Sequence, residues 1–186
     1  MQNKQNVSIV GLGHIGLPMM TILSNLRKNG KYLYNVNVIE KNNRLGKDKQ
    51  KNIKEKKFIF NTNDKKFNQL LKKTINFSQV EVRTDFENIN KADIIIISIN
   101  FEIKKNKKDF KPLIELIRNI GKKIKKNSLI LFETTLPPGT CEKILVPILK
   151  KILFKKKINM EEICFAYSFE RVMPGQDYLN SITSNF

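Results

Sequence analysis

A glycine-rich turn, placed directly between a short apolar strand and an amphipathic helix, constrains this chain more than any other feature. Residues 7–10 are rich in β-branched apolar residues, and the turn GLGHIG follows at residues 11–16. After the turn, apolar residues recur at the spacing of a helix face: Ile15, Met19, Ile22, Leu23 and Leu26. Strand, turn and helix in this order predict the opening of a βαβ unit, which a second strand at residues 35–40 completes.

Strand and helix patterns alternate along the rest of the chain. Further strands are predicted over residues 80–83, 94–99, 128–132 and 163–167, and helices over residues 65–73, 110–126 and 140–154. The lysine-rich stretch 41–57 has little periodicity and is expected to be a solvated loop or a frayed helix, and the most mobile segment. The alternation predicts an α/β fold with a doubly wound, mostly parallel, Rossmann-like sheet, in a single domain over residues 1–186. In such a fold, ligands bind at the carboxyl ends of the strands.

The helix predicted over residues 140–154 contains three residues of special chemistry. Thr140 follows a Pro-Pro-Gly turn and is expected to cap the helix, and Pro147 is expected to kink it. Cys141 lies in the first turn, where the helix dipole lowers a thiol pKa, but we expect a structural cysteine. Cys164 falls in a predicted strand and is expected in the core. Two cysteines are too few for a disulfide framework, so we expect a reducing cytoplasm.

The chain is strongly basic, with 35 Lys and Arg residues against 17 Asp and Glu residues and a formal charge of +18. Such a charge can mark a polyanion-binding surface. Lys, Asn and Ile are all abundant, however, and Ala occurs only at Ala92 and Ala166, as expected from AT-rich codons. We therefore favour compositional drift over a solvated surface, and nucleic acid is not expected as a partner. The longest apolar stretch, residues 94–97, is too short to span a bilayer, so no membrane partner is expected.

The glycine turn has the residues that a dinucleotide pyrophosphate requires. Gly11 permits a tight turn, Gly13 lets the backbone approach the phosphates, and Gly16 allows the helix to pack closely on the strand. His14 and Ile15 are expected to contact the cofactor through their backbone, where the N–H groups and the positive helix end face the phosphates. We expect no catalytic role for the His14 ring. The alternative is a glycine turn without a ligand.

Glu40 ends the second predicted strand, where a carboxylate can accept hydrogen bonds from the adenosine ribose. A carboxylate at this place also repels a 2′-phosphate, so NAD is predicted in preference to NADP. Lys41 and Arg44 follow closely and are expected to soften that repulsion, with Arg44 at the cofactor site. The alternative is an exposed acid at a strand end.

Two further motifs follow predicted strands, ETTLPPGT at residues 133–140 and SFERVMPG at residues 168–175. A pair of hydroxyls and a carboxylate converging on the ligand-binding edge of the sheet could hold a water or a sugar hydroxyl. A proline-stiffened turn and a helix cap explain the first motif equally well without a function.

Together with GLGHIGLP at residues 11–18, these motifs resemble those of the nucleotide-sugar dehydrogenases, which oxidise UDP-glucose, GDP-mannose or UDP-N-acetylhexosamines to uronic acids. The three motifs occur in the family's order and span almost the whole chain. SFERVMPG looks like the family's SPER-x-x-PG. Together with the following DYLNSI, it is most similar to members that act on N-acetylated or related amino sugars.

The resemblance implies that two NAD per turnover oxidise the C6 alcohol of a UDP-sugar, through a cysteine-bound thiohemiacetal and thioester. It places Thr135 near the catalytic water and the cofactor, and makes Glu170 the carboxylate that assists proton transfer and hydrolysis. Ser98 is placed at the NAD site, although SINFEI at residues 98–103 departs from the family's Thr-Pro pattern, which leaves the contacts of Ser98 and Asn100 open. Phe169 replaces the family's common proline.

The family's nucleophile motif GxGGxC, its oxyanion-stabilising Lys and Asn, its central helix and its sugar-nucleotide domain are absent from these 186 residues. We therefore expect an amino-terminal half that binds NAD and is inactive alone. It would take a UDP-sugar only with the missing half, from a separate carboxyl-terminal chain or from a longer protein of which this is a piece. A non-catalytic dinucleotide-binding remnant and a Lys-rich polyanion-binding module are the alternatives. No metal site is expected.

Overall fold

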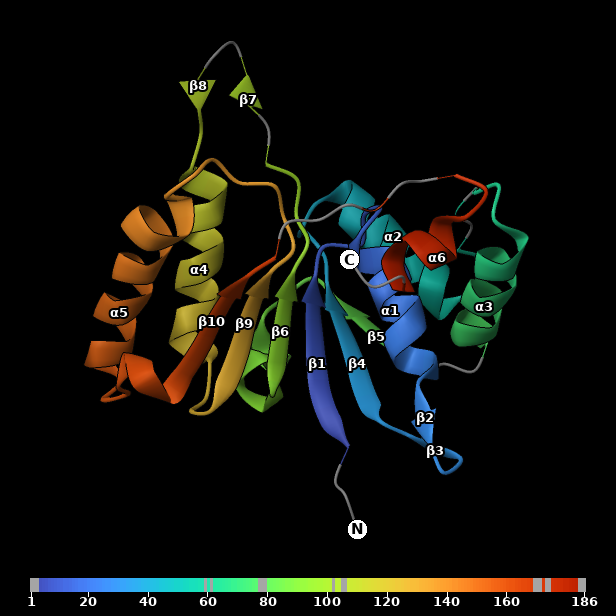
Figure 1. Ribbon diagram of the computed structural model, residues 1–186, viewed down its shortest axis with the longest axis horizontal. Coiled ribbons are helices and arrows are strands. Elements are labelled where there is room, and N and C mark those ends of the chain that lie inside the picture. The colour runs from blue at the N-terminus through green and yellow to red at the C-terminus, as the bar shows by residue number, and fades with distance from the viewer. Residues whose placement is uncertain are drawn as a thin grey trace.

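A six-stranded parallel sheet forms the centre of the computed structural model, which describes residues 4–58, 60, 62–76, 80–101, 103–104, 107–168, 172 and 175–183 (Figure 1). In spatial order the strands are β10 (Ile163–Tyr167), β9 (Ser128–Phe132), β6 (Ile94–Ile97), β1 (Gln5–Val10), β4 (Tyr34–Ile39) and β5 (Val80–Arg83). Every neighbouring pair in this sheet is parallel. The predicted α/β class, with a doubly wound Rossmann-like sheet, is confirmed.

Helices cover both faces of the sheet. They are α1 (Gly16–Asn25), α2 (Arg44–Lys54), α3 (Lys65–Asn76), α4 (Lys111–Lys123), α5 (Val146–Lys155) and α6 (Tyr178–Thr183). Shorter helical turns are η1 (Glu87–Lys91), η2 (Cys141–Leu145) and η3 (Met160–Glu162). Two small hairpins pair β2 (Arg27–Lys28) with β3 (Lys31–Tyr32), and β7 (Ile103–Lys104) with β8 (Lys107–Lys108). Across the described part of the chain, no helix has the length and apolar character that crossing a membrane requires.

Side chains of the sheet alternate between two hydrophobic clusters. Ile9 packs in the cluster that α1 and α3 complete, whereas Val10, the next residue, packs in the cluster under α4 and α5. The same alternation splits β6, whose Ile96 faces the first cluster and whose Ile95 and Ile97 face the second. This explains the continuous apolar run in the sequence, because a central parallel strand is buried on both faces.

The stretch predicted as a loop or frayed helix contains a regular helix, α2, so the loop alternative is wrong. Asn43 caps it, since its side chain accepts a hydrogen bond of 2.9 Å from the backbone N–H of Gly46. Gln50 donates to the carbonyl of Val82 over 2.8 Å, and Ile53 is buried. This helix, with few apolar residues, is therefore held by its cap, by the hydrogen bond of Gln50 to β5 and by the buried Ile53.

Two expectations about helices need correction. α1 forms where predicted, but its most buried apolar side chains are Leu17 and Met20, and Leu26 is 40% exposed. The reason is that Gly16 faces the sheet and sets the buried side of the helix. Thr140 does not cap its helix, because its hydroxyl donates instead to the carbonyl of Pro137. Pro147 was expected inside this helix with a kink, but it lies in the first turn of α5, where a proline is tolerated, and the turn that precedes α5 is the π-helical η2.

The sheet order reverses between β1 and β6, and this places the switch point of the fold at their carboxyl ends. From β1 the chain continues outward to β4 and β5, and from β6 it continues the other way to β9 and β10. All six strands point the same way, toward the end of the molecule where the β7–β8 hairpin projects (Figure 1). Ligands of open α/β sheets bind at such a reversal.

Candidate functional site

The glycine turn lies at this reversal, and two of its glycines are required by the fold itself. Gly11 has a φ of +100°, and a Cβ atom there would lie 2.6 Å from the carbonyl oxygen of Ser98, the residue that follows the neighbouring strand β6. A Cβ atom on Gly16 would lie 1.9 Å from the carbonyl oxygen of Gly11. Both residues therefore allow the turn to fold tightly between β1, β6 and α1.

Gly13 is different, because none of the residues that the structure describes requires a glycine at this position. A Cβ atom on Gly13 would meet no heavy atom within 4 Å, and its φ is not in the left-handed region. The position opens onto free space at the start of α1, where Ile15 provides no side-chain cap. A helix start with uncapped N–H groups beside open space is a suitable place for an anion.

Glu40 lies directly after β4 and reaches across to the glycine turn. Its Oε1 accepts hydrogen bonds from the backbone N–H of Leu12 at 2.6 Å and from Nζ of Lys49 at 2.9 Å, and its Oε2 accepts from the backbone N–H of Lys41 at 3.1 Å. Only 10% of the Glu40 side chain is exposed. The alternative of an exposed strand-end acid is therefore wrong.

Lys49 is the residue of this site that the sequence did not reveal. Its Nζ also donates to the carbonyl of Leu12 over 2.9 Å, so it joins α2 to the glycine turn as well as to Glu40. Arg44, predicted at the cofactor site, is the exposed first residue of α2, and the ion pair with Glu40 comes from Lys49. Nothing in the sequence pattern indicated this pairing, because stretch 41–57 was not expected to form a regular helix.

Ser98 supports the turn from the neighbouring strand. It is buried, and its hydroxyl lies 3.2 Å from the carbonyl oxygen of Val10 and 3.1 Å from that of Gly11. Asn100, two residues later, is exposed. The described contacts of Ser98 are thus with the turn, and its contact with a cofactor stays a prediction.

The two threonines after β9 have opposite environments. Thr134 is buried, and its hydroxyl donates to the carbonyl of Ile99 over 2.9 Å, which joins the segments after β9 and β6. Thr135 is exposed at the same edge of the sheet. The hydroxyl pair therefore does not act as a unit, and Thr135 is the one open to a ligand. Glu170, predicted as its catalytic partner, lies outside the described residues.

A short helix that the sequence did not predict, α6, packs on the glycine turn. The hydroxyl of Tyr178, a buried residue, donates to the carbonyl of His14, and the His14 ring contacts Phe60 edge-on at 5.5 Å between centroids. The backbone N–H of Leu179 donates to Oδ2 of Asp64 over 2.8 Å. The chain that follows the SFERVMPG motif is thus tied to the turn predicted to bind the cofactor.

Asp64 is a buried carboxylate that anchors both α6 and α3. Its Oδ1 accepts a hydrogen bond of 3.0 Å from the backbone N–H of Phe67 in the first turn of α3. Burial acts to raise the pKa of Asp64, but the backbone N–H groups of Leu179, Phe67 and Lys66 together hold it below its ordinary value. The carboxylate therefore stays ionised at neutral pH and acts as a structural acceptor.

The two cysteines lie in different environments. Burial, and then the neighbouring Glu142 carboxylate, raise the pKa of the Cys141 thiol, which outweighs the lowering expected from the helix dipole. Cys164 is exposed, so the expectation of a core position is wrong. The reason is that β10 is the edge strand of the sheet, and α5 covers only its other face.

We expect iodoacetamide to modify Cys164 at least about tenfold faster than Cys141 at pH 8, because a partly buried thiol with a raised pKa forms less of the reactive thiolate. Peptide mass spectrometry over a time course measures both rates in one sample. In Cys164→Ser the rapid phase of iodoacetamide modification should disappear, while the slow modification of Cys141 stays. Faster modification of Cys141 would contradict the environment described for it.

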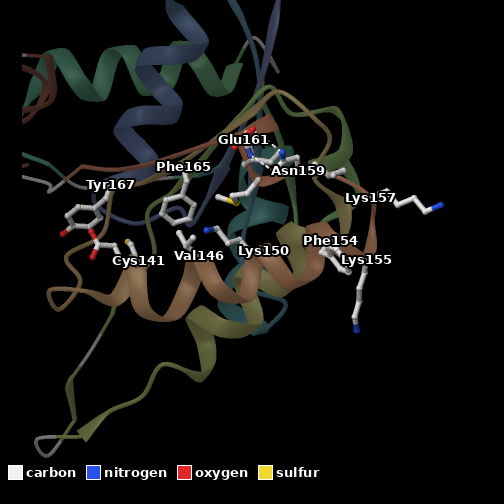
Figure 2. Close-up of a pocket in the computed structure, with 14 residues that line it drawn as sticks. Cys141, Val146, Lys150, Phe154, Lys155, Lys157, Asn159, Glu161, Phe165 and Tyr167 are labelled. Atoms are coloured by element: carbon white, nitrogen blue, oxygen red, sulfur yellow. Dashed lines mark hydrogen bonds between the residues drawn. The ribbon is translucent and has the colours of Figure 1, made fainter.

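An open groove of about 1440 Å³ lies between α5 and β10. Figure 2 shows Cys141, Val146 and Lys150 on its helix side, and Phe165 and Tyr167 on its strand side. The groove lies at the edge of the sheet, apart from the glycine turn. Its only thiol is the weakly acidic Cys141.

Among the residues that the structure describes, no three His, Cys, Asp or Glu side chains lie together as a metal site would require.

Comparison with known proteins identifies similar sequences over almost the whole chain. Residues 5–185 match the family model described as UDP-glucose/GDP-mannose dehydrogenase family, NAD binding domain. Protein CapL of Staphylococcus aureus is 30% identical over 172 residues, which cover 92% of this chain and 36% of CapL. The UDP-N-acetyl-D-mannosamine dehydrogenase of Methanocaldococcus jannaschii is 32% identical over 175 residues, covering 92% of this chain and 35% of that protein. The chain thus spans about a third of the length of these curated relatives.

The fold is also shared with solved structures. The crystal structure of NDP-N-acetyl-D-galactosaminuronic acid dehydrogenase from Methanosarcina mazei Go1 superposes with a TM-score of 0.80. Sequence identity is 24%, and the match covers 95% of this chain and 36% of that one. At this level of identity the superposition establishes the arrangement of strands and helices.

Proposed function

This chain belongs to the UDP-glucose/GDP-mannose dehydrogenase family, as its NAD binding domain, and from this we propose that it is the NAD-binding half of a nucleotide-sugar 6-dehydrogenase. The resemblance drawn from the three sequence motifs is confirmed, and NAD is the cofactor. Several curated relatives are UDP-N-acetyl-D-mannosamine dehydrogenases, which supports a UDP-linked N-acetylated amino sugar as substrate, oxidised at C6 to the uronate. Two free thiols support a reducing cytoplasm as its compartment.

In this proposal the pyrophosphate lies on residues 11–16 and the adenosine ribose lies beside Glu40. The open space at Gly13 is the observation that supports it most directly, because a ligand requires the glycine there and the fold does not. His14 and Ile15 would contribute backbone N–H groups, with Ser98 and Arg44 at the margins of the site. The alternative is that the glycine turn binds no ligand. Measurements of NADH binding would distinguish the two.

The bound NAD supplies the hydride acceptor for oxidation of the sugar alcohol. Thr135 is exposed at the carboxyl end of β9, which supports a role in holding a water or a substrate hydroxyl next to the cofactor. Glu170 follows β10 in sequence, and we propose that it assists proton transfer and hydrolysis. The nucleophilic thiol, the oxyanion donors and most of the sugar-nucleotide site would come from a carboxyl-terminal half, in a longer protein or in a separate chain.

Replacing Glu40 by Ala should reduce the preference for NADH over NADPH by about tenfold, equivalent to about 1.4 kcal/mol. The change removes the acceptor of the ribose hydroxyls and leaves the positive charge of Lys49 unpaired beside a 2′-phosphate. Calorimetric titration with each dinucleotide measures the ratio of the two dissociation constants.

The matched control is Glu115→Ala, which removes the same charge from an exposed position on the distant helix α4. It should leave the ratio as in the parent chain. A ratio that is also unchanged in Glu40→Ala would remove Glu40 from the ribose site.

A further inference from the structure

We infer that Lys49 is a second ribose-binding residue, and that it sets how strictly this domain discriminates between NAD and NADP. The inference rests on the proposed placement of the adenosine ribose beside Glu40. It begins from one cluster: Nζ of Lys49 lies 2.9 Å from Oε1 of Glu40 and 2.9 Å from the carbonyl oxygen of Leu12. The cluster joins α2, the end of β4 and the glycine turn.

The position of Lys49 follows from the way α2 packs. A Cβ atom on Gly46 would lie 1.9 Å from the carbonyl oxygen of Lys41, so the glycine allows the helix to approach the end of β4 closely. Lys49 is three residues later, on the same side of the helix. Gln50 fixes the neighbouring turn through its hydrogen bond to the carbonyl of Val82. Lys49 is therefore directed at Glu40 by a fixed helix.

The remaining hydrogen-bonding capacity of the pair matches a ribose. An ammonium group has three N–H donors, of which the Leu12 carbonyl and Glu40 occupy two. The Lys49 side chain is 34% exposed, so its third donor can reach a ligand. Oε1 of Glu40 already accepts two hydrogen bonds, whereas Oε2 accepts one from the backbone of Lys41 and can accept another. One free donor beside one free acceptor suits a hydroxyl, which both accepts and donates.

The charge of Lys49 also changes what Glu40 can exclude. A bare carboxylate repels a 2′-phosphate, but a carboxylate paired with an ammonium group 2.9 Å away presents nearly no net charge. The sequence suggested that Lys41 and Arg44 weaken the repulsion between Glu40 and a 2′-phosphate. We assign this effect to Lys49 instead, because Lys49 forms the ion pair with Glu40. The domain should consequently bind NADPH measurably, although more weakly than NADH.

The test compares Lys49→Met with the parent chain in calorimetric titrations with NADH and with NADPH. Methionine keeps an unbranched side chain of similar length but removes the charge and the donors. We expect the dissociation constant for NADPH to rise at least about tenfold more than that for NADH, since only NADPH carries a 2′-phosphate that the unpaired Glu40 carboxylate would repel. Lys49→Arg should restore most of the NADPH affinity.

Lys47→Met is the matched control, because Lys47 is an exposed lysine of the same helix, and this variant should leave both dissociation constants unchanged. Equal weakening of the two dinucleotides in Lys49→Met would overturn the inference and leave Lys49 as a structural link between α2 and the turn. No change in either would also overturn it. If the parent chain bound neither NADH nor NADPH, the proposed function itself would fail.

Discussion

Replacing Gly13 by Val is expected to weaken NADH binding at least about 100-fold, equivalent to about 2.7 kcal/mol, with the fold intact. The branched side chain would fill the open space over the start of α1 and keep the pyrophosphate from approaching the backbone. Because the new Cβ atom meets no atom of the described residues within 4 Å, the fold is expected to stay unchanged. Calorimetry measures the affinity, and circular dichroism with thermal melting measures the fold.

Gly16→Ala provides the contrasting control. A Cβ atom there would lie 1.9 Å from the carbonyl oxygen of Gly11, so this variant should lower the melting temperature. Gly13→Ala should keep the melting temperature and reduce affinity less than Gly13→Val. Unchanged affinity in Gly13→Val would show that no ligand approaches the turn and would return the glycines to a purely structural role.

The isolated chain is expected to produce no NADH from any UDP-sugar, even at high concentrations of NAD. In the proposed function, most of the sugar-nucleotide site that holds the C6 alcohol beside NAD would come from a carboxyl-terminal half. The thiol that carries the acyl group and the donors that stabilise the oxyanion would come from that half too. Cys141 is a poor substitute because its thiol is partly buried and its pKa is raised. Absorbance at 340 nm follows NADH, with a complete family enzyme as the positive control. NADH formation by this chain alone would refute the prediction and bring Cys141 and Cys164 into consideration as nucleophiles.

Adding a carboxyl-terminal half as a separate chain should restore turnover, and it allows the roles of two residues to be separated. In the restored enzyme Glu170→Gln should slow hydrolysis, so that a protein-bound thioester accumulates and is detected by mass spectrometry. Thr135→Ala should act more weakly, by about 0.5–1.5 kcal/mol, because it removes one hydrogen bond. Buried Thr134 should not substitute for it, since its hydroxyl already donates to the carbonyl of Ile99. If Glu170→Gln hydrolysed at the parent rate, Glu170 would have no part in that step.

Local patterns were sufficient to predict the sheet and the glycine turn. β9 and β10 occupy the predicted ranges 128–132 and 163–167. A short apolar run between polar flanks carries its strand signal within a few residues. The turn at residues 11–16 was recognisable for the same reason: its glycines, its preceding strand and its following helix are all neighbours in sequence.

Contacts between segments distant in sequence could not be predicted in this way. Tyr178 and His14 are 164 positions apart, and only the packing of α6 against the turn brings them together. Lys49 and Glu40 are nearer in sequence, but their pairing depends on the close approach that Gly46 allows between α2 and β4. A pattern of residue types does not encode such approaches, because they depend on how whole elements pack.

The positions of the long strands along the chain, the place of the glycine turn and the acid that follows the second long strand were all predictable from the sequence, since each depends on residues close together in sequence. Which side chains remain open to a ligand was not readable. Thr135 rather than Thr134 is exposed, and Cys164 lies at an edge rather than in the core. Exposure depends on what packs against a residue from elsewhere in the chain. Cys164 is exposed because β10 is an edge strand, and Thr134 is buried because its hydrogen bond joins the segments that follow β9 and β6.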